Sequence, residues 1–147
     1  MPTGIKSDPY RSHRFRVEID GIAAASFADV TIPAVNTAPI DYREGTDPAH
    51  VRKLSGMNSF GNVTLKRGVT RSMDLHNWYK QVMQNGAEQA RKSLSIVLVD
   101  DEGNDRARWN VSEAWPIKYE TSALSAKSAE VMIETIEIVH EGISRIA

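Results

Sequence analysis

The chain has 147 residues, enough for one ordinary domain, and its 41% hydrophobic and 25% charged residues are the mixture found in soluble globular proteins. Its formal net charge of −1 creates no overall field that would favour nucleic acid or a membrane surface. The lack of cysteine excludes a disulfide framework, thiolate metal sites and cysteine nucleophiles, and fits a reducing compartment.

The first predicted element is a strand over residues 12–20, in which polar and less polar side chains alternate strictly. A period of two predicts a strand with one buried face. Asp20-Gly21 then predicts a hairpin turn, and residues 22–32 are expected to be extended. No apolar stretch of a secretion signal precedes the strand, and no run approaches the ~20 apolar residues of a membrane span, so stable membrane insertion is not expected.

The segment of about residues 33–58 differs in composition from its surroundings. It is rich in breakers and has only a short strand-like piece at residues 40–43; the breakers are Pro33, Pro39, Gly45, Pro48 and Gly56. This pattern predicts an extended loop. Long structureless connections are uncommon in compact domains and tend to be functional.

A strand around Val63 and Leu65 leads into a corner formed by Lys66, Arg67 and Gly68. One interpretation is an anion site at the N-terminus of the helix that follows. The other is that Gly68 permits an unusual φ angle, while the two cations face solvent or a neighbouring subunit. No nucleophile, base or phosphate-binding loop stands near the corner in sequence, which favours the second interpretation.

A helix is predicted over about residues 73–85. Its apolar residues fall at helical spacing on one stripe, namely Leu75, Trp78, Tyr79, Val82 and Met83. The first four are expected to anchor the helix to the strands, with Trp78 at the centre. Ser72 or Asp74 can cap the start of the helix, and Gly86 can end it.

The remaining sequence predicts three more strands. Alternating patterns at 93–99 and 106–111 flank the acidic turn 100–105 and predict a second hairpin, with Trp109 in the core. The last strand, 130–140, changes apolar phase near Glu134-Thr135, as a bulge or a strand covered on both faces would explain. In total, the chain is expected to have six or seven strands and one helix.

No motif points to chemistry. The four histidines are far apart in sequence and make a metal site improbable; they are His13, His50, His76 and His140. Dinucleotide-binding, phosphate-binding and nucleophile-elbow motifs are missing, and the acidic turn lacks the spacing of a calcium-binding EF-hand loop. We therefore expect no catalytic residue, no metal and no cofactor.

A family resemblance covers about residues 8–143. The corner "VTLKRGVT", followed by a helix containing "LHNWYKQV", resembles the corresponding corner of contractile-tail tube proteins. Other markers follow in the family's order: "DPYRSHRFRVEIDGI" resembles its first strand, "IDYREGTDPAHVRKLSGMNSFGNVTLKRG" its extended loop and next strand, "RWNVSEAWPIKYE" its Trp-containing strand, and "SAEVMIETIEIVHEGI" its last strand. The relatives are myophage tail tubes, extracellular contractile injection systems and, more distantly, the Hcp protein of type VI secretion.

The resemblance implies a mainly β fold, a small antiparallel β-barrel or sandwich with one flanking helix, as a single tail-tube domain over 1–147. It implies hexameric rings stacked into a hollow tube inside a sheath, with the sheath protein, baseplate or hub and terminator proteins as partners. The tube would carry protein cargo or DNA and have no enzymatic activity. It would be assembled in bacterial cytoplasm and become part of a phage tail or a released injection particle. The corner is then architectural.

Within this family, the segment from Asp41 to Asn58 is expected to be the contact arm between subunits or rings. Its charges are balanced, with Asp41, Glu44 and Asp47 against Arg43, Arg52 and Lys53. Charges in such an arm gain complementarity when they meet a neighbouring subunit.

Two other classes of protein stay open. A monomeric ligand-binding barrel or small enzyme would have a closed apolar pocket with convergent polar groups. A specialised terminal ring or Hcp-like paralogue would share the tube fold. The size of the protein in solution separates the first alternative from a ring. The sequence does not distinguish a phage tail from an injection system.

Overall fold

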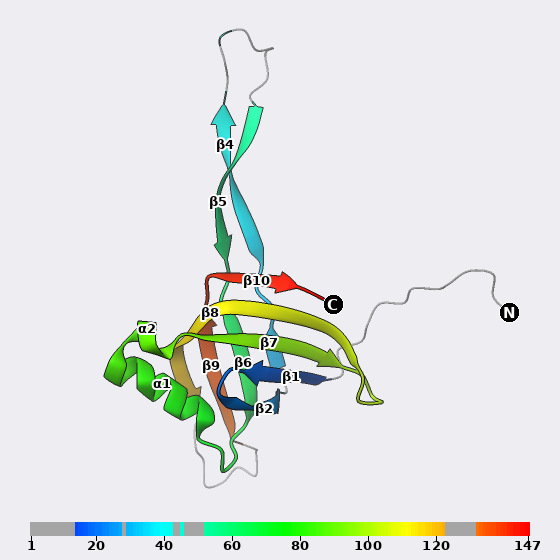
Figure 1. Cartoon of the computed structure of the whole chain (residues 1–147), viewed down its shortest axis with the longest axis vertical. Helices are drawn as coiled ribbons and strands as arrows, with labels where there is room; N and C mark the ends of the chain where they lie inside the picture. Colours follow the sequence, from blue (N-terminus) through cyan, green and yellow to red (C-terminus); the bar gives the residue numbers. More distant parts are fainter. Residues whose placement is uncertain (1–13, 28, 43–44, 46–51, 123–131) are drawn as a thin grey trace, which may run out of the picture.

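The computed structural model describes residues 14–27, 29–42, 45, 52–122 and 132–147, and within them the chain is mainly β, as predicted (Figure 1). The elements in chain order are β1 Arg14–Ile19, β2 Ile22–Phe27, β3 Asp29–Thr31, β4 Val35–Tyr42, β5 Arg52–Phe60, β6 Val63–Gly68, α1 Asp74–Asn85, α2 Ala87–Ala90, β7 Lys92–Val99, β8 Asp105–Thr121, β9 Ile133–Val139 and β10 Gly142–Arg145.

The body of the protein is one antiparallel sheet that folds over on itself. Its strand order is β2-β1-β7-β8-β9-β6-β3, with β10 paired to β8. In Figure 1, β1 and β7 run crosswise to β6 and β9. The path ends at β2 and β3, and no ladder joins these two strands among the described residues, so the sheet is not a closed barrel.

Strand β8 belongs to both layers of the folded sheet. Its first part pairs with β7 and its second part, from Trp115, pairs with β9. Near the end of the first part, at the register shift between Val111 and Ala114, Glu113 has a φ of 53°, a left-handed conformation that is uncommon for a residue with a side chain. The change of backbone direction there lets one long strand connect the layers around the core.

The core lies between the layers and is closed at one side by α1. Fully buried apolar side chains come from strands of both layers, as the alternating patterns predict, and include Val17, Leu65, Ile96, Val111 and Ile136. The helix contributes Leu75 and Trp78 to the same cluster. Trp109 packs against this core as predicted, although it stays half-buried, with the Arg145 guanidinium 5.7 Å from its ring centre.

Both predicted hairpins are present. Gly21, with a φ of 76°, forms the turn between β1 and β2. In the turn between β7 and β8, Asp100 accepts hydrogen bonds from the backbone N–H of Asn104 at 2.8 Å and of Glu102 at 3.0 Å. These bonds, the one from Asn104 first, hold the pKa of Asp100 below its ordinary value. The acidic turn is thus a structural one.

The prediction of an extended loop over about residues 33–58 is wrong in one respect, because β4 and β5 in this segment form a β-hairpin. β4 and β5 pair with each other over their length as a separate two-stranded sheet. Strand periodicity was hidden because all eight residues of β4 are exposed, so no core face imposes a strict alternation of polar and apolar side chains along the whole strand.

The change of apolar phase near Glu134 in the last strand is not caused by a bulge in that strand. β9 pairs with β6 without a register shift, and its buried positions are Glu134, Ile136 and Ile138. A buried carboxylate therefore occupies an apolar phase.

Helix α1 matches the predicted range within one residue. Gly86 ends it, with a φ of 84° and its N–H donated to the Val82 carbonyl at 3.0 Å. At the start, Met73 occupies the N-cap position and makes no side-chain cap, but the Ser72 hydroxyl accepts a long hydrogen bond of 3.4 Å from the backbone N–H of Asp74, the first helical residue. The short helix α2, which the sequence pattern did not predict, follows directly after Gly86.

Candidate assembly site

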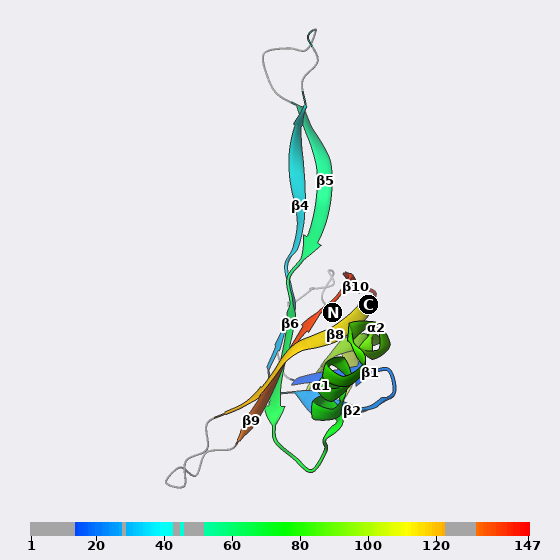
Figure 2. The same cartoon turned by 90° about the vertical axis from the view of Figure 1, so that its left-hand side faces the viewer.

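The hairpin of β4 and β5 projects from the body as an arm (Figures 1 and 2). Almost every residue of its two strands is exposed, and none belongs to the buried core. Eight residues of strand at ~3.3 Å each give the arm a length of roughly 26 Å. Only at its base does the arm pack on the body, where the Phe60 ring lies 5.6 Å from the His140 ring, so the rest of its length offers a surface to another molecule.

The two faces of the arm differ in chemistry. Residues directly opposite in an antiparallel pair share a face. Ile40 is opposite Leu54 and Tyr42 is opposite Arg52, and Ala38 shares their phase along β4. We call Ala38, Ile40, Tyr42 and Leu54 the apolar face; the charged Arg52 lies on the same side, opposite Tyr42 at the outer end.

The opposite face, which we call the polar face, holds Thr37, Asp41, Lys53 and Asn58 together with Pro39 and Ser55, and Val35 and Phe60 lie at its base. The Thr37 hydroxyl donates to Asn58 Oδ1 at 2.7 Å, and Lys53 forms an ion pair with Asp41. Both pairs lie across the two strands, so each of these polar groups has a partner within the arm.

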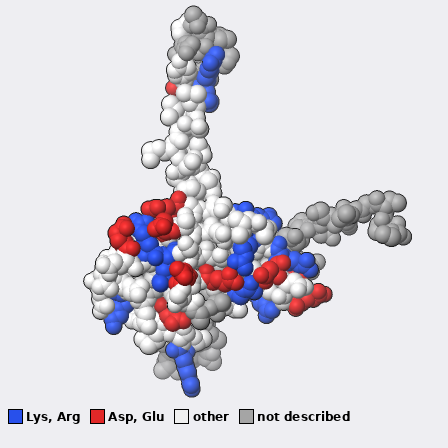
Figure 3. All heavy atoms as spheres, viewed as in Figure 1, with Lys and Arg blue, Asp and Glu red and all other residues white. Residues whose placement is uncertain are grey.

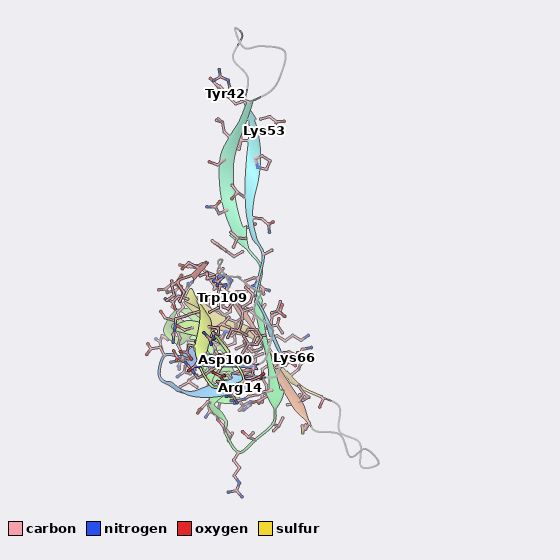
Figure 4. All side chains as sticks on the ribbon, turned by 90° about the vertical axis from the view of Figure 1, so that its right-hand side faces the viewer. Arg14, Tyr42, Lys53, Lys66, Asp100 and Trp109 are labelled. Carbon is pink, nitrogen blue, oxygen red and sulfur yellow. The ribbon has the colours of Figure 1, made fainter. Side chains whose placement is uncertain are left out.

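Charge is confined to the outer end of the arm. Figure 3 shows an uncharged shaft, and Figure 4 labels Tyr42 and Lys53 near the tip. Of the six charged residues predicted for the contact arm, Asp41, Arg52 and Lys53 lie on the described strands. Arg43, Glu44 and Asp47 lie outside the described residues.

The corner at the end of β6 contains a buried ionic cluster. Arg67 Nε donates to Glu134 Oε1 at 2.5 Å, and the Tyr119 hydroxyl donates to Glu134 Oε2 at 2.6 Å. The side chains of Arg67 and Glu134 are 10% and 3% exposed. The Arg67 guanidinium also lies 5.3 Å from the centre of the Phe27 ring. Desolvation, and secondly the hydrogen bond to Glu134, raise the pKa of Tyr119 to about 12.

This cluster decides between the two interpretations of the corner. The expectation that both cations face outward is wrong for Arg67, whose guanidinium is engaged in the core, and correct for Lys66, which is exposed (Figure 4). Gly68 is the last residue of β6, opposite Ile133 of β9, and its φ is not positive, so the unusual φ angle expected there is wrong. Arg67 Nη2 is buried without a hydrogen-bond partner, and its charge is already compensated by Glu134. The corner is therefore a structural junction.

The predicted helix anchors lie on the core side of α1. Leu75 and Trp78 are each 1% exposed, whereas Tyr79 and Val82 are half-buried. The Trp78 indole Nε1 donates to the Ala90 carbonyl at 2.6 Å, which ties α1 to the end of α2. Met83, which the helical pattern assigned to the same stripe, is 63% exposed.

A second charged cluster covers one face of the sheet over Val97, which is fully buried between Arg16 of β1 and Arg108 of β8. Arg16 binds Asp105 at 2.9 and 3.0 Å, and Arg108 binds Glu18 at 2.8 Å. The hydrogen bond from Arg108 lowers the pKa of Glu18, and the one from Arg16 lowers the pKa of Asp105. The paired charges leave no net charge to attract an ion.

The described part of the chain holds no cluster of three or more metal-ligating side chains. His140 bonds the Gly61 carbonyl at 2.8 Å, and His76 packs edge-on against the Tyr119 ring, while His13 and His50 lie outside the described residues. Among described residues, no helix is long and apolar enough to cross a membrane. An open groove of about 860 Å³ crosses β1, β7, β8 and β10, with polar and apolar residues mixed along it.

The family model of the T4-like virus tail tube protein gp19 matches residues 11–144, nearly the whole chain. The chain belongs to this family. It is therefore a tail tube protein of a phage tail or a related contractile injection particle, and its family is structural and not enzymatic. None of the curated proteins compared with it matches.

Solved structures agree with the family. A chain of the extracellular contractile injection system PVC, in its extended sheath-tube complex, is 26% identical with a TM-score of 0.80, covering 95% of this chain and 92% of that one. A chain of the PVC sheath/tube terminator is also 26% identical, with a TM-score of 0.80 and coverage of 96% and 99%. Hcp1 from Flavobacterium johnsoniae, 21% identical with a TM-score of 0.58 over 90% and 94%, shares the fold.

Sequence reasoning missed two members of the buried cluster, Glu134 and Tyr119. The signal for Glu134 was the phase change in the last strand, because a carboxylate in an apolar phase requires a buried cation. Tyr119 carried no such signal, since a tyrosine in a strand is ordinary.

Proposed function

We propose that this protein is the repeating subunit of an inner tube, in which hexameric rings of one tail-tube domain, residues 1–147, stack around a hollow lumen. The lumen would pass protein cargo or DNA. The sheath protein, the baseplate or hub, and the terminator would be its partners, after assembly in the bacterial cytoplasm. The family membership and the sheath-tube and terminator relatives support this proposal.

The observation that carries the proposal is the exposed arm. An isolated two-stranded hairpin is at best marginally stable in water, because too little of its surface is covered. This arm has two long strands, and beyond the contact of Phe60 with His140 at its base, nearly all residues of both strands stay exposed in the described structure. Contact with a neighbouring subunit supplies the missing cover.

The same arm has a counterpart in a tube. β4 and β5 together contain 17 residues, whereas the PVC chain leaves only 5% of the 147 residues uncovered. At least part of the arm must therefore be matched by that chain. Since the relative is part of a sheath-tube complex, the match supports an arm that works in an assembled tube.

Electron microscopy tests the proposal on the purified full chain and on native particles from the source organism. We expect six-fold rings or tubes, and the chain present in many copies along the particle. A terminal-ring paralogue would instead be found in only one ring per particle.

A monodisperse monomer at high protein concentration, combined with absence of the chain from any particle, would overturn the proposal. The combination matters because ring formation can require a baseplate for nucleation.

A further inference from the structure

We infer that the arm binds a second copy of this chain through its apolar face alone, while its polar face stays in water. The inference rests on the proposed function and adds which side of the arm makes the contact. It assigns the contact to Ala38, Ile40, Tyr42 and Leu54.

The exposure of the apolar face is the first observation. Ile40 is 52% exposed, Leu54 48% and Tyr42 38%, and the three side chains lie together in the outer half of the hairpin. Scattered apolar side chains on a surface are normal, but a contiguous patch on one side of a projecting element indicates an interface.

Gly56 provides the second observation, because its missing side chain shapes this face. A Cβ placed at Gly56 would lie 2.7 Å from the Ala38 carbonyl oxygen and 2.9 Å from Ile40 Cγ1. Ile40 therefore packs across β5 over the glycine. The resulting face is apolar, and no side chain projects from it at Gly56, which suits close packing against another flat surface.

The polar face gives the third observation, since four of its polar groups are already paired. Thr37 bonds Asn58, and Asp41 pairs with Lys53, whose side chains remain 65% and 63% exposed. Covering these charges would require desolvation without any new partner. Leaving them in water has no such cost, so burial favours the apolar face.

The chemistry of the arm also selects its partner. A nucleic acid would need cations along the shaft, and the shaft from Val35 to Ile40 and from Leu54 to Phe60 has no charged residue (Figure 3). An apolar face fits an apolar protein surface. A second copy of this chain fits the arm, because an arm of roughly 26 Å can extend along the body of a neighbour. A head-to-tail contact of this kind repeats from copy to copy along a tube.

Single-cysteine labelling tests the face assignment cleanly because the natural chain has no cysteine. Ile40→Cys and Leu54→Cys probe the apolar face, and Thr37→Cys and Asn58→Cys are the matched probes on the polar face. In tubes, we expect a water-soluble maleimide to label the first pair at least about tenfold more slowly than in unassembled protein, and the second pair at an unchanged rate. Equal protection of both faces, or protection of the polar face only, would overturn the inference.

Paired substitutions test the same claim through assembly. Ile40→Thr with Leu54→Thr makes the apolar face polar while keeping residues suited to strands. Thr37→Val with Asn58→Thr changes the polar face to a similar extent. We expect the first variant to remain folded by circular dichroism but form few or no tubes, and the second to form tubes of normal length. Normal tubes from the first variant would contradict the inference.

The two proposals fail in different ways. If the wild-type chain forms no ring or tube and is missing from particles, the proposed function is wrong. If wild-type tubes form and the two faces respond alike, only the face assignment is wrong.

Discussion

Among single residues, Arg67 and Glu134 form a buried ion pair, with side chains 10% and 3% exposed. They are register partners on β6 and β9, and both are buried. A buried ion pair adds little net stability, since desolvation offsets the attraction between its charges. Removing only one partner strongly lowers the stability, because the other charge is left buried and uncompensated.

Arg67→Met should therefore lower the free energy of unfolding by about 3–5 kcal/mol, as measured by urea denaturation. The double variant Arg67→Met with Glu134→Leu should recover most of this loss, because no charge then remains buried. Lys66→Ala is the matched control on the same strand, and its effect should stay within about 0.5 kcal/mol because Lys66 is exposed. A harmless Arg67→Met would show that the ion pair is not formed in solution.

Because of Tyr119, the stability of the folded protein is expected to depend on pH in the alkaline range. Its pKa is raised to about 12 in the folded protein, against an ordinary value of 10.0. The folded state therefore favours the neutral phenol. The resulting stability is fully present below pH 10 and is lost as the pH rises from about 10 to about 12.

Tyr119→Phe should remove this alkaline loss. The variant is less stable than wild type at neutral pH, because Glu134 loses a hydrogen bond worth about 1–3 kcal/mol. The difference between the two proteins should shrink between pH 10 and 12, as followed by thermal unfolding at each pH. A constant difference would mean that Tyr119 ionises normally in the folded state.

At the scale of elements, strands of the body such as β1 and β9 could be predicted because their buried side chains alternate along one face. β7 differs, since its residues from Ile96 to Val99 are all buried. The arm could not be predicted as strands, because neither face is buried within the subunit. The cluster at the corner could not be predicted either, since Arg67, Tyr119 and Glu134 meet only through the pairing of β6, β8 and β9.

We predict that Trp78 is a main anchor of helix α1 on the body. The side chain is 1% exposed, and its indole hydrogen bond reaches Ala90 of α2. Trp78→Ala should cost about 3–5 kcal/mol of unfolding free energy, the usual range for a large-to-small change in a core. Trp78→Phe retains much of the packing and should cost less.

Met83→Ala is the control on the same helix, because Met83 is 63% exposed. Its effect should stay within about 0.5 kcal/mol. Circular dichroism should show the largest drop in melting temperature for Trp78→Ala, a smaller one for Trp78→Phe and almost none for Met83→Ala. An unchanged melting temperature for Trp78→Ala would exclude the anchor role.

At the scale of the whole molecule, the arm is structurally separable from the body. The core cluster contains no residue of β4 or β5, so the arm should not be needed for folding. Asn36 and Ser59 are cross-strand partners at the base of the arm. A two-residue turn of the Asn-Gly type can join such a pair without changing the direction of the strands.

Replacing residues 37–58 with Asn-Gly should therefore give a soluble, folded protein without the arm. We expect a circular dichroism spectrum typical of β structure and a cooperative melting transition, because every core contact is retained. Tubes should not form, since the surface that connects neighbouring copies is missing. Electron microscopy and sedimentation of the variant beside wild type measure this. Full-length tubes would refute the contact role of the arm, whereas an unfolded variant would show that the arm belongs to the folding unit of the body.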